Sequence, residues 1–379
     1  MAIFDKLNKF LDTKIIELSE RLENRHSKPQ KTSPQERRTQ PAPTKGKFAR
    51  PTFRPGRTLP LMVTEKCNLR CTYCLRNTGD NGKEIPFPVL KRIILSAHRF
   101  GIRDFSITGG EILVYPYWRE LIKLIGSLKS SVFIETNGFS LKEEDVVFLK
   151  NTLNNRISKI LVSLDSYRSD VHDKFRGKGA FNRAVRAIKL LRKYNIPIEV
   201  NALLTPLNFM NEEDILNYIK FNKKLGVREI VLGEAVGLGR AKNSRFLLNE
   251  NQRRQISQIL AKHNYFKGEG AINFRPGGFF ISSGLQPCHR LGVEIAVSPY
   301  GLHPCIFQID TIKIGDFGDL EKLLYSNFLD SLYWTGAAMQ ECFKKEIFFS
   351  CAKCIKYLPE WLSRIKKDTF LNPKQNEKN

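Results

Sequence analysis

Three cysteines follow one another closely at Cys67, Cys71 and Cys74, and thiolates at this spacing bind iron or zinc. An iron–sulfur cubane needs four ligands, so three cysteines leave one iron open to a small molecule. A structural zinc site is the alternative, but zinc needs a fourth ligand and typically pairs two C-x2-C motifs. The C-x3-C-x2-C spacing therefore favours an iron–sulfur cluster with one open iron.

The remaining five cysteines lie in the last quarter of the chain, and none stands between the two groups. They are Cys288, Cys305, Cys342, Cys351 and Cys354. Eight cysteines in 379 residues are too few for a secreted disulfide scaffold. In a reducing compartment such groups are typically metal ligands, and the last two have the C-x2-C spacing of a metal site.

The elements that position these cysteines form a repeated βα pattern that begins at Leu61. Six strands are predicted, at Leu61–Thr64, Phe105–Thr108, Val132–Thr136, Lys159–Leu164, Ile198–Leu204 and Glu229–Leu232. Helices are predicted near Pro88–Phe100, Tyr117–Leu128, Leu141–Lys150, Phe181–Tyr194, Glu212–Leu225 and Asn249–Lys262. Parallel strands joined by helices present their functional loops at the carboxyl ends of the strands. The first cysteine group follows the first strand, so it lies at such an end.

Short polar motifs stand at the same ends of the next strands. They are Gly109-Gly110-Glu111 after the second strand, Thr136-Asn137-Gly138 after the third and Ser163-Leu164-Asp165 after the fourth. Each motif alone is an ordinary turn signal. Together with the three cysteines, and with Tyr73 before the third, they resemble the radical S-adenosylmethionine (radical SAM) superfamily in the expected order.

This resemblance implies an α/β fold, a partial (βα)6 TIM-like barrel over residues 61–268. Cys67, Cys71 and Cys74 would hold a [4Fe–4S] cluster that binds SAM. Tyr73 would pack beside the adenine, Gly109, Gly110 and Glu111 would hold the methionine amino group, and Asn137, Ser163 and Asp165 would contact the carboxylate and ribose. The cluster would reduce SAM to a 5′-deoxyadenosyl radical that abstracts a substrate hydrogen atom. A reductase, flavodoxin or ferredoxin would supply the electron.

Further motifs resemble the branch of the superfamily that carries a C-terminal SPASM or twitch extension. They are His172-Asp173, Arg176-Gly177, Gly179-Ala180-Phe181 and Gly239-Arg240-Ala241. The resemblance implies an extension over residues 269–379 with one auxiliary [4Fe–4S] cluster on Cys288, Cys305, Cys351 and Cys354. The shorter Gly301–Cys305 spacing and the absence of further cysteines argue against a second auxiliary cluster. Cys342 has three alternative roles: a substitute ligand, a buried thiol, or a catalytic hydrogen-atom donor.

The resemblance fixes the chemistry better than the substrate. Modification of a peptide or protein is the first prediction, and modification of a cofactor precursor, tetrapyrrole or lipid is the alternative. The net charge of +24 keeps RNA modification or nucleic-acid binding open, but no basic and aromatic recognition module is visible. A non-enzymatic iron–sulfur scaffold is the last alternative, which formation of 5′-deoxyadenosine would exclude.

The N-terminal residues predict an amphipathic helix over 1–25, followed by a basic, proline-rich linker over 26–60. The helix has a continuous apolar stripe and balanced charges, so it would dock on a partner protein, on its own domain or on a membrane surface. No apolar run reaches the length of a membrane span, and the first residues do not match a signal peptide. We therefore expect a cytoplasmic protein, with peripheral membrane attachment as the alternative to a protein contact.

Overall fold

The computed structural model describes residues 58–263 apart from 210, 228 and 243, together with 272–275, 294–306, 309 and 312–324. Several predictions fall outside these described residues. They are the helix over 1–25, the linker over 26–60 up to residue 57, and the cysteines Cys288, Cys342, Cys351 and Cys354.

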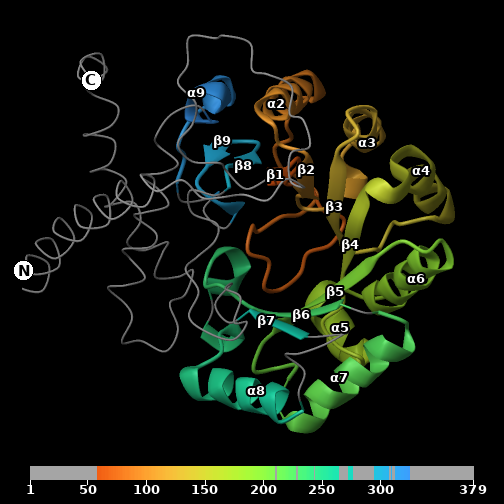
Figure 1. Ribbon diagram of the computed structural model, residues 1–379. Helices are drawn as coiled ribbons and strands as arrows, with labels where there is room; N and C mark the ends of the chain where they lie inside the picture. Colours follow the sequence, from red (N-terminus) through yellow and green to blue (C-terminus); the bar gives the residue numbers. More distant parts are fainter. Residues whose placement is uncertain are drawn as a thin grey trace, which may run out of the picture.

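Nine strands form one sheet in the order β7-β6-β5-β4-β3-β2-β1-β8-β9, and all neighbours are parallel except β8 and β9. The strands are β1 (Thr58–Met62), β2 (Asp104–Thr108), β3 (Ser131–Thr136), β4 (Ile157–Ser163), β5 (Ile198–Leu204), β6 (Glu229–Glu234), β7 (Ile272–Arg275), β8 (Ala296–Ser298) and β9 (Gly301–His303). The α-helices are α2 (Phe87–Phe100), α3 (Trp118–Ser127), α4 (Glu143–Leu153), α5 (Ser169–Arg176), α6 (Ala180–Lys193), α7 (Glu212–Lys224), α8 (Glu250–Lys262) and α9 (Leu320–Leu324). Most helices cover the outside of the curved sheet, and the loop after β1 lies within its curve (Figure 1).

The predicted α/β fold with a mainly parallel sheet is confirmed, and each of the six strands and six helices predicted for the βα repeat overlaps an observed one. The predicted end of the linker was wrong: β1 begins at Thr58, so the last three residues predicted as linker belong to the sheet. Pro60 made them look like linker, because proline cannot donate to a strand ladder. It is tolerated here because β8 pairs with β1 at Leu61 alone, which leaves Pro60 paired only with Ser106 of β2.

The described segments beyond residue 268 extend both edges of the sheet. Strand β7 pairs with β6, and the β8–β9 hairpin adds to β1 at the other edge. The described part of the predicted 269–379 extension is therefore continuous with the sheet of the core. These three strands have only three or four residues each and α5 has only two buried residues, so none of them shows a clear hydrophobic period in the sequence.

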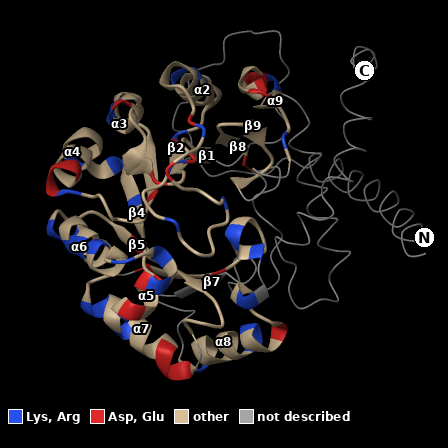
Figure 2. Cartoon of the chain, turned by 180° about the vertical axis from the view of Figure 1, so that it is seen from behind, with Lys and Arg blue, Asp and Glu red and all other residues tan. Residues whose placement is uncertain are grey.

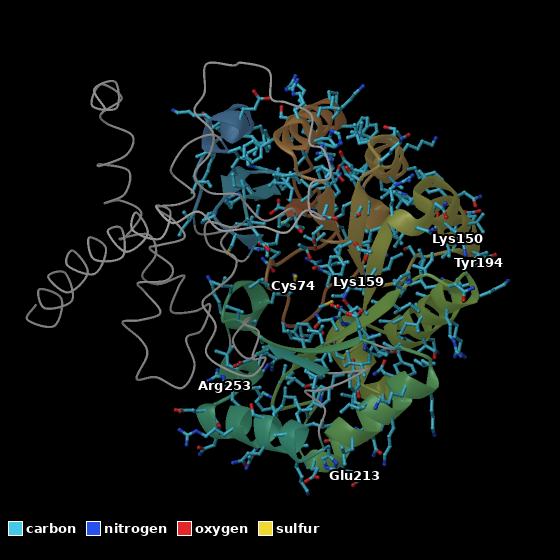
Figure 3. All side chains as sticks on the ribbon, in the orientation of Figure 1. Cys74, Lys150, Lys159, Tyr194, Glu213 and Arg253 are labelled. Atoms are coloured by element: carbon cyan, nitrogen blue, oxygen red, sulfur yellow. The ribbon has the colours of Figure 1, made fainter. Side chains whose placement is uncertain are left out.

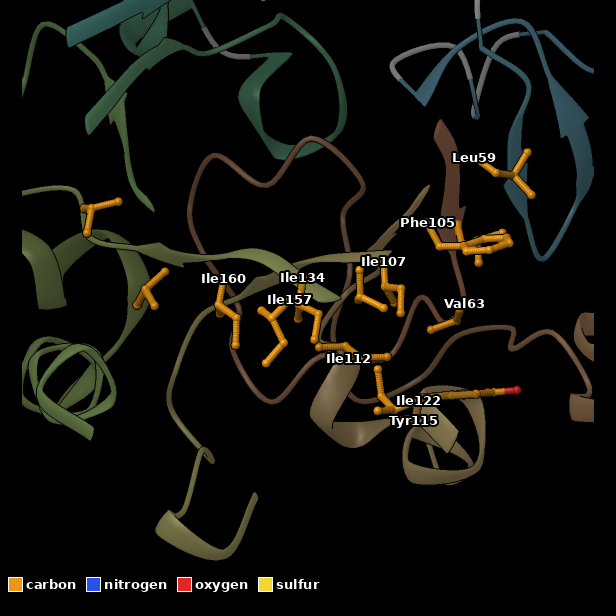
Figure 4. Close-up of a cluster of buried hydrophobic side chains, with 14 of the residues drawn as sticks. Leu59, Val63, Phe105, Ile107, Ile112, Tyr115, Ile122, Ile134, Ile157 and Ile160 are labelled. Carbon is orange, nitrogen blue, oxygen red and sulfur yellow. The ribbon is translucent and has the colours of Figure 1, made fainter. Parts of the chain in front are cut away.

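The core is built from rows of β-branched side chains in register across the strands. Ile107 of β2 pairs with Ile134 of β3, and Ile134 pairs with Ile160 of β4 (Figure 4). Helices α2 and α3 cover this row with buried side chains such as Ile94 and Ile122. Each buried side chain of this size contributes about 1.5–3 kcal/mol to folding, so the row holds the strand ends in fixed positions.

Basic side chains lie mainly on the outer helices, as Figure 2 shows for α6. The five Lys and Arg residues of α6 are exposed, whereas its alanines and two of its large aliphatic residues face the core. Such a pattern is that of a solvated helix face. Among the described residues, no helix is long and apolar enough to cross a bilayer.

Candidate functional site

The loop after β1 carries the three cysteines of the first group and is folded back on itself. Cys67 is buried, whereas Cys71 and Cys74 are half-buried, and none of the three is in a disulfide. The backbone N–H of Cys67 donates to the carbonyl of Gly79 at 2.7 Å, and Cys74 N–H donates to the carbonyl of Cys71 at 3.2 Å. Figure 3 shows Cys74 near the middle of the curved sheet. The loop thus places its thiols at the carboxyl ends of the strands, as predicted.

The Gly-Gly-Glu segment after β2 packs directly against this loop. A Cβ on Gly110 would lie 2.2 Å from the carbonyl oxygen of Lys66, so only glycine fits at this position. The backbone N–H groups of Gly110 and Glu111 donate to the carbonyls of Thr64 and Lys66 at 2.7 and 2.9 Å. The segment is therefore fastened to the residue immediately before Cys67.

Glu111 joins the end of β2 to the end of β3. Its carboxylate is buried and accepts hydrogen bonds from Thr136 Oγ1 and Asn137 N, both at 2.7 Å, and from Leu113 N at 3.2 Å. Burial raises the pKa of this carboxyl, and the donors from Asn137, Thr136 and Leu113 oppose the rise. With both oxygens occupied, Glu111 fixes the geometry of the two strand ends.

Asn137 reaches from the end of β3 to the cysteine loop. Its Nδ2 lies 3.7 Å from Cys67 Sγ and donates to Asn68 Oδ1 at 2.8 Å. The Cys67 sulfur also accepts the backbone N–H of Leu69 at 3.4 Å. Cys67 is therefore held by groups on its own loop and on β3.

Tyr73 and Asp165 meet in a buried group of charged and aromatic side chains. The Tyr73 hydroxyl donates to Asp165, and Arg176 forms an ion pair with the same carboxylate at 2.5 Å. The Tyr73 ring packs against Phe175 and Phe246, with ring centroids 5.6 and 6.2 Å away. Asp165 also accepts the backbone N–H of Leu203 at 3.0 Å. Asp165 therefore positions Tyr73, Arg176 and the end of β5.

Ser163 and Cys305 are the two other predicted site residues that the structure describes. Ser163 is the half-buried last residue of β4. Cys305 is buried just after β9, and the next residue, Ile306, accepts a hydrogen bond from Arg76 of the cysteine loop. The segment that carries Cys305 is thus tied to the loop that carries Cys74. The proposed ligand partners of Cys305 lie outside the described residues.

The thiols need a compensating positive charge or metal to ionise in this environment. Burial raises the pKa of Cys67 to about 12, and Glu111 and the other two thiols act in the same direction. Burial also raises the pKa of Cys71, against which Arg176 acts. Burial alone would lower the pKa of Arg176, but Asp165 and the thiols raise it, so its guanidinium stays charged. A metal centre binds thiolates strongly enough to deprotonate thiols, so metal binding would offset the free energy needed to ionise these buried cysteines.

The residues present fit an iron–sulfur cluster. Three soft thiol ligands lie on one loop. The thiols of Cys71 and Cys74 both raise the pKa of Cys67, and the thiols raise the pKa of the charged Arg176 in turn. Within the part of the chain that the structure describes, no three His, Cys, Asp or Glu side chains converge on a single metal ion. A cubane is larger than an ion and each thiolate binds its own iron, so its ligands stand further apart.

Three functional candidates had no role assigned from the sequence. Arg176 pairs with Asp165, Arg240 contacts the cysteine loop, and His172 Nδ1 accepts the backbone N–H of Asp165 at 3.0 Å. In the sequence, the motifs that contain them indicated only a resemblance to the branch with a SPASM or twitch extension. Their position in the sequence could have identified them, because each follows a predicted strand. His172 and Arg176 lie on α5 after β4, and Arg240 follows β6.

Comparison with known proteins agrees with this site. Residues 61–222 match the family model of the radical SAM superfamily. The antilisterial bacteriocin subtilosin biosynthesis protein AlbA of Bacillus subtilis is 25% identical over 301 residues, which cover 77% of this chain and 65% of AlbA. A probable GTP 3′,8-cyclase of Saccharolobus islandicus is 29% identical over 308 residues, which cover 78% of this chain and 92% of that protein. The match therefore spans somewhat less than two thirds of AlbA and most of the cyclase.

The fold also matches solved structures. Streptococcus suis SuiB bound to S-adenosylmethionine superposes with a TM-score of 0.58 at 17% identity, covering 73% of this chain and 67% of SuiB. At this identity the likeness concerns the fold alone. The cysteine loop, the strand-end motifs and the family match over residues 61–222 agree with one another. Residues 61–222 are a radical SAM domain, and the cofactors of that superfamily are a [4Fe–4S] cluster and S-adenosylmethionine.

Proposed function

We propose that this protein cleaves SAM reductively and uses the resulting radical to abstract a hydrogen atom from a peptide or protein. When bound, the cluster supplies the electron that splits SAM into methionine and a 5′-deoxyadenosyl radical. The chain's own residues bind and orient SAM, exclude water and hold the substrate within reach. The observation that carries the proposal is the placement of Cys67, Cys71 and Cys74 against Glu111 and Asn137 at neighbouring strand ends.

Three groups of residues would divide the binding of SAM. Cys67, Cys71 and Cys74 would hold the cluster. The Gly109–Glu111 segment and Asn137 border the thiol of Cys67, where the methionine end of SAM would lie. Tyr73, Ser163 and Asp165 would contact the adenosine, and the aromatic packing around Tyr73 would exclude water from the radical.

The relatives support two substrate classes. AlbA takes part in bacteriocin biosynthesis, which supports a peptide substrate. The probable GTP 3′,8-cyclase supports a small nucleotide instead, and the match covers nearly all of that protein. A nucleotide or cofactor precursor is therefore our second candidate substrate. RNA is less favoured, because the described basic side chains of α6 form a solvated helix face.

SAM cleavage is tested with the reconstituted, reduced protein by measuring 5′-deoxyadenosine. The wild-type protein should form it slowly even without substrate, and Cys71→Ala should not, because the cluster loses a ligand. Cys305→Ala is the matched control, since it removes a buried thiol outside the first loop and should retain SAM cleavage. Formation of 5′-deoxyadenosine by the Cys71→Ala protein would refute the proposed cluster site.

The substrate is tested by mass spectrometry of peptides and small molecules from cells with and without the protein. A peptide that carries a fixed mass change only when the protein is present supports the first candidate. In parallel, the purified protein is given SAM, reductant and GTP, and consumption of GTP supports the second. The Cys71→Ala protein serves as the blank in both experiments.

A further inference from the structure

Arg240 lies on the short turn after β6 (Gly239–Lys242), yet its side chain reaches into the cysteine loop after β1. Its Nε donates to the carbonyl of Cys71 at 2.7 Å. Its two terminal nitrogens donate to Asn77 Oδ1 and to the carbonyl of Thr78, both at 2.9 Å. One guanidinium therefore binds three separate points of the loop.

The backbone beside Arg240 presses against the same loop. The N–H of Arg240 donates to the carbonyl of Cys74 at 2.9 Å. Gly239 has φ +54°, and a Cβ there would lie 2.4 Å from the carbonyl oxygens of Cys74 and Leu75. Only glycine allows this approach, so the turn after β6 is shaped to bring Arg240 against the loop.

The three bonds suit an arginine and no other side chain. A guanidinium carries five N–H donors in one plane, whereas a lysine ammonium is a compact point charge. The loop forms two consecutive turns, in which Cys74 N–H donates to Cys71 and Asn77 N–H donates to Cys74. Arg240 binds oxygens from both turns, so it fixes one turn relative to the other.

Cys67 is held by different groups. Its sulfur accepts from Leu69 N and contacts Asn137, and its backbone bonds to Gly79. None of these bonds involves Arg240. Among the attachments of the loop, the one to the end of β3 holds Cys67, and the one to the turn after β6 holds Cys71 and Cys74.

We propose that Arg240 is a positioning residue that fixes Cys71 and Cys74 relative to Cys67 before the cluster is loaded. The relevance of this role to catalysis rests on the proposed function, in which these cysteines hold the cluster. The role itself belongs to the unloaded chain, because all the bonds that define it are between protein atoms. It can therefore be tested without SAM or iron.

The test measures alkylation of the cysteines by iodoacetamide in the reduced, iron-free protein. After quenching and denaturation, trypsin cuts at Lys66, Arg70 and Arg76, so Cys67 is read in peptide 67–70 and Cys71 and Cys74 in peptide 71–76. Labelling of a folded protein follows local opening of the chain. Arg240→Gln should raise the labelling rate of peptide 71–76 about tenfold, equivalent to about 1.4 kcal/mol. Peptide 67–70 should change less than about twofold.

Lys242→Gln is the matched control, because it removes one positive charge from an exposed side chain of the same turn. It should leave both labelling rates at their wild-type values. Arg240→Lys keeps the charge but not the planar donors, so it should raise the rate of peptide 71–76 to an intermediate value. This variant decides the question if Arg240→Gln fails to fold.

The proposal is overturned if peptide 71–76 of Arg240→Gln is labelled at the wild-type rate. If Arg240→Gln does not fold, a wild-type rate in Arg240→Lys overturns it. An equal rise in both peptides would also overturn it, because that is the result of general destabilisation. The outcome is independent of the proposed function: a wild-type protein that forms no 5′-deoxyadenosine refutes SAM cleavage and leaves the labelling result unchanged.

Discussion

Gly110 is the residue at which the site tolerates least change. A Cβ there would lie 2.2 Å from the Lys66 carbonyl oxygen, which belongs to backbone and cannot rotate away. Gly110→Ala should therefore push the cysteine loop away from the end of β2. We expect a loss of about 1–3 kcal/mol in the free energy of unfolding and little or no 5′-deoxyadenosine.

Gly237→Ala is the control for this substitution. A Cβ on Gly237 would meet only the Leu247 side chain, at an ordinary 3.5 Å. Urea unfolding and the 5′-deoxyadenosine assay should give wild-type values for this variant. A Gly110→Ala protein with wild-type SAM cleavage would mean that the loop does not pack against the Gly-Gly-Glu segment.

His172 should make stability depend on pH. Burial lowers its pKa from 6.5 to about 4, with Arg176 in the same direction and Asp165 opposed. Between these values the unfolded chain binds a proton that the folded chain does not, so folded stability falls as the pH drops through this window. The full difference is about 3 kcal/mol, at 1.36 kcal/mol per pKa unit.

The measurement compares urea unfolding of the iron-free wild type and His172→Gln from pH 7.5 to 4. Other acidic groups titrate in both proteins and cancel in the comparison. The stability of the wild type should fall by about 3 kcal/mol more than that of the variant across the window. Parallel pH curves for the two proteins would show that His172 is not buried in its neutral form.

At the scale of elements, the strands and helices that position the site could be predicted from sequence. Alternation of β-branched runs with amphipathic stretches located β5 (Ile198–Leu204) with both ends correct. Helix ends were located less well, and α4 begins at Glu143 instead of Leu141, where the Asp145 carboxylate accepts the backbone N–H of Lys142 at 3.0 Å. The loop-to-strand bonds could not be predicted, since they join residues far apart in the sequence, as Arg240 and Cys71 do.

Helix α8 is joined to the sheet by a partly buried ion pair in addition to its buried side chains Ile256 and Leu260. Arg253 of α8 pairs with Glu234, the last residue of β6, whose side chain is 1% exposed. Arg253→Ala would remove the Arg253 ion pair from this buried carboxylate, which should cost about 3 kcal/mol of unfolding free energy. Chemical denaturation measures this loss.

The neighbouring Arg254 provides the matched control. It pairs with Glu250 on the same helix, but both side chains are at least half exposed. Arg254→Ala should therefore cost no more than about 0.5 kcal/mol. Equal losses for the two variants would show that Arg253 contributes only as a surface pair.

At the scale of the whole molecule, the β8–β9 edge of the sheet is connected to the cysteine loop. The β8–β9 hairpin pairs with β1, and the Tyr300 hydroxyl of its turn donates to Glu65 at 2.9 Å. Arg76 binds the carbonyl of Ile306, next to Cys305. The sequence predicted a small C-terminal cysteine-rich extension, because cysteines and turns are visible in a sequence. The pairing of the β8–β9 hairpin with β1 is not visible there.

The iron content of the reconstituted protein tests the two predicted cluster sites. Two complete thiolate sites, one on Cys67, Cys71 and Cys74 and one that includes Cys305, should hold about eight irons in the reconstituted protein. Changing the three cysteines of the first loop together to alanine should leave about half of the iron, because the second set of ligands lies elsewhere in the chain. Cys305→Ala should lower the iron by a similar amount while 5′-deoxyadenosine formation continues. Iron and sulfide analysis measures both.

A wild-type content near twelve irons would require a third cluster, and a content unchanged by the triple substitution would place the iron away from the first loop.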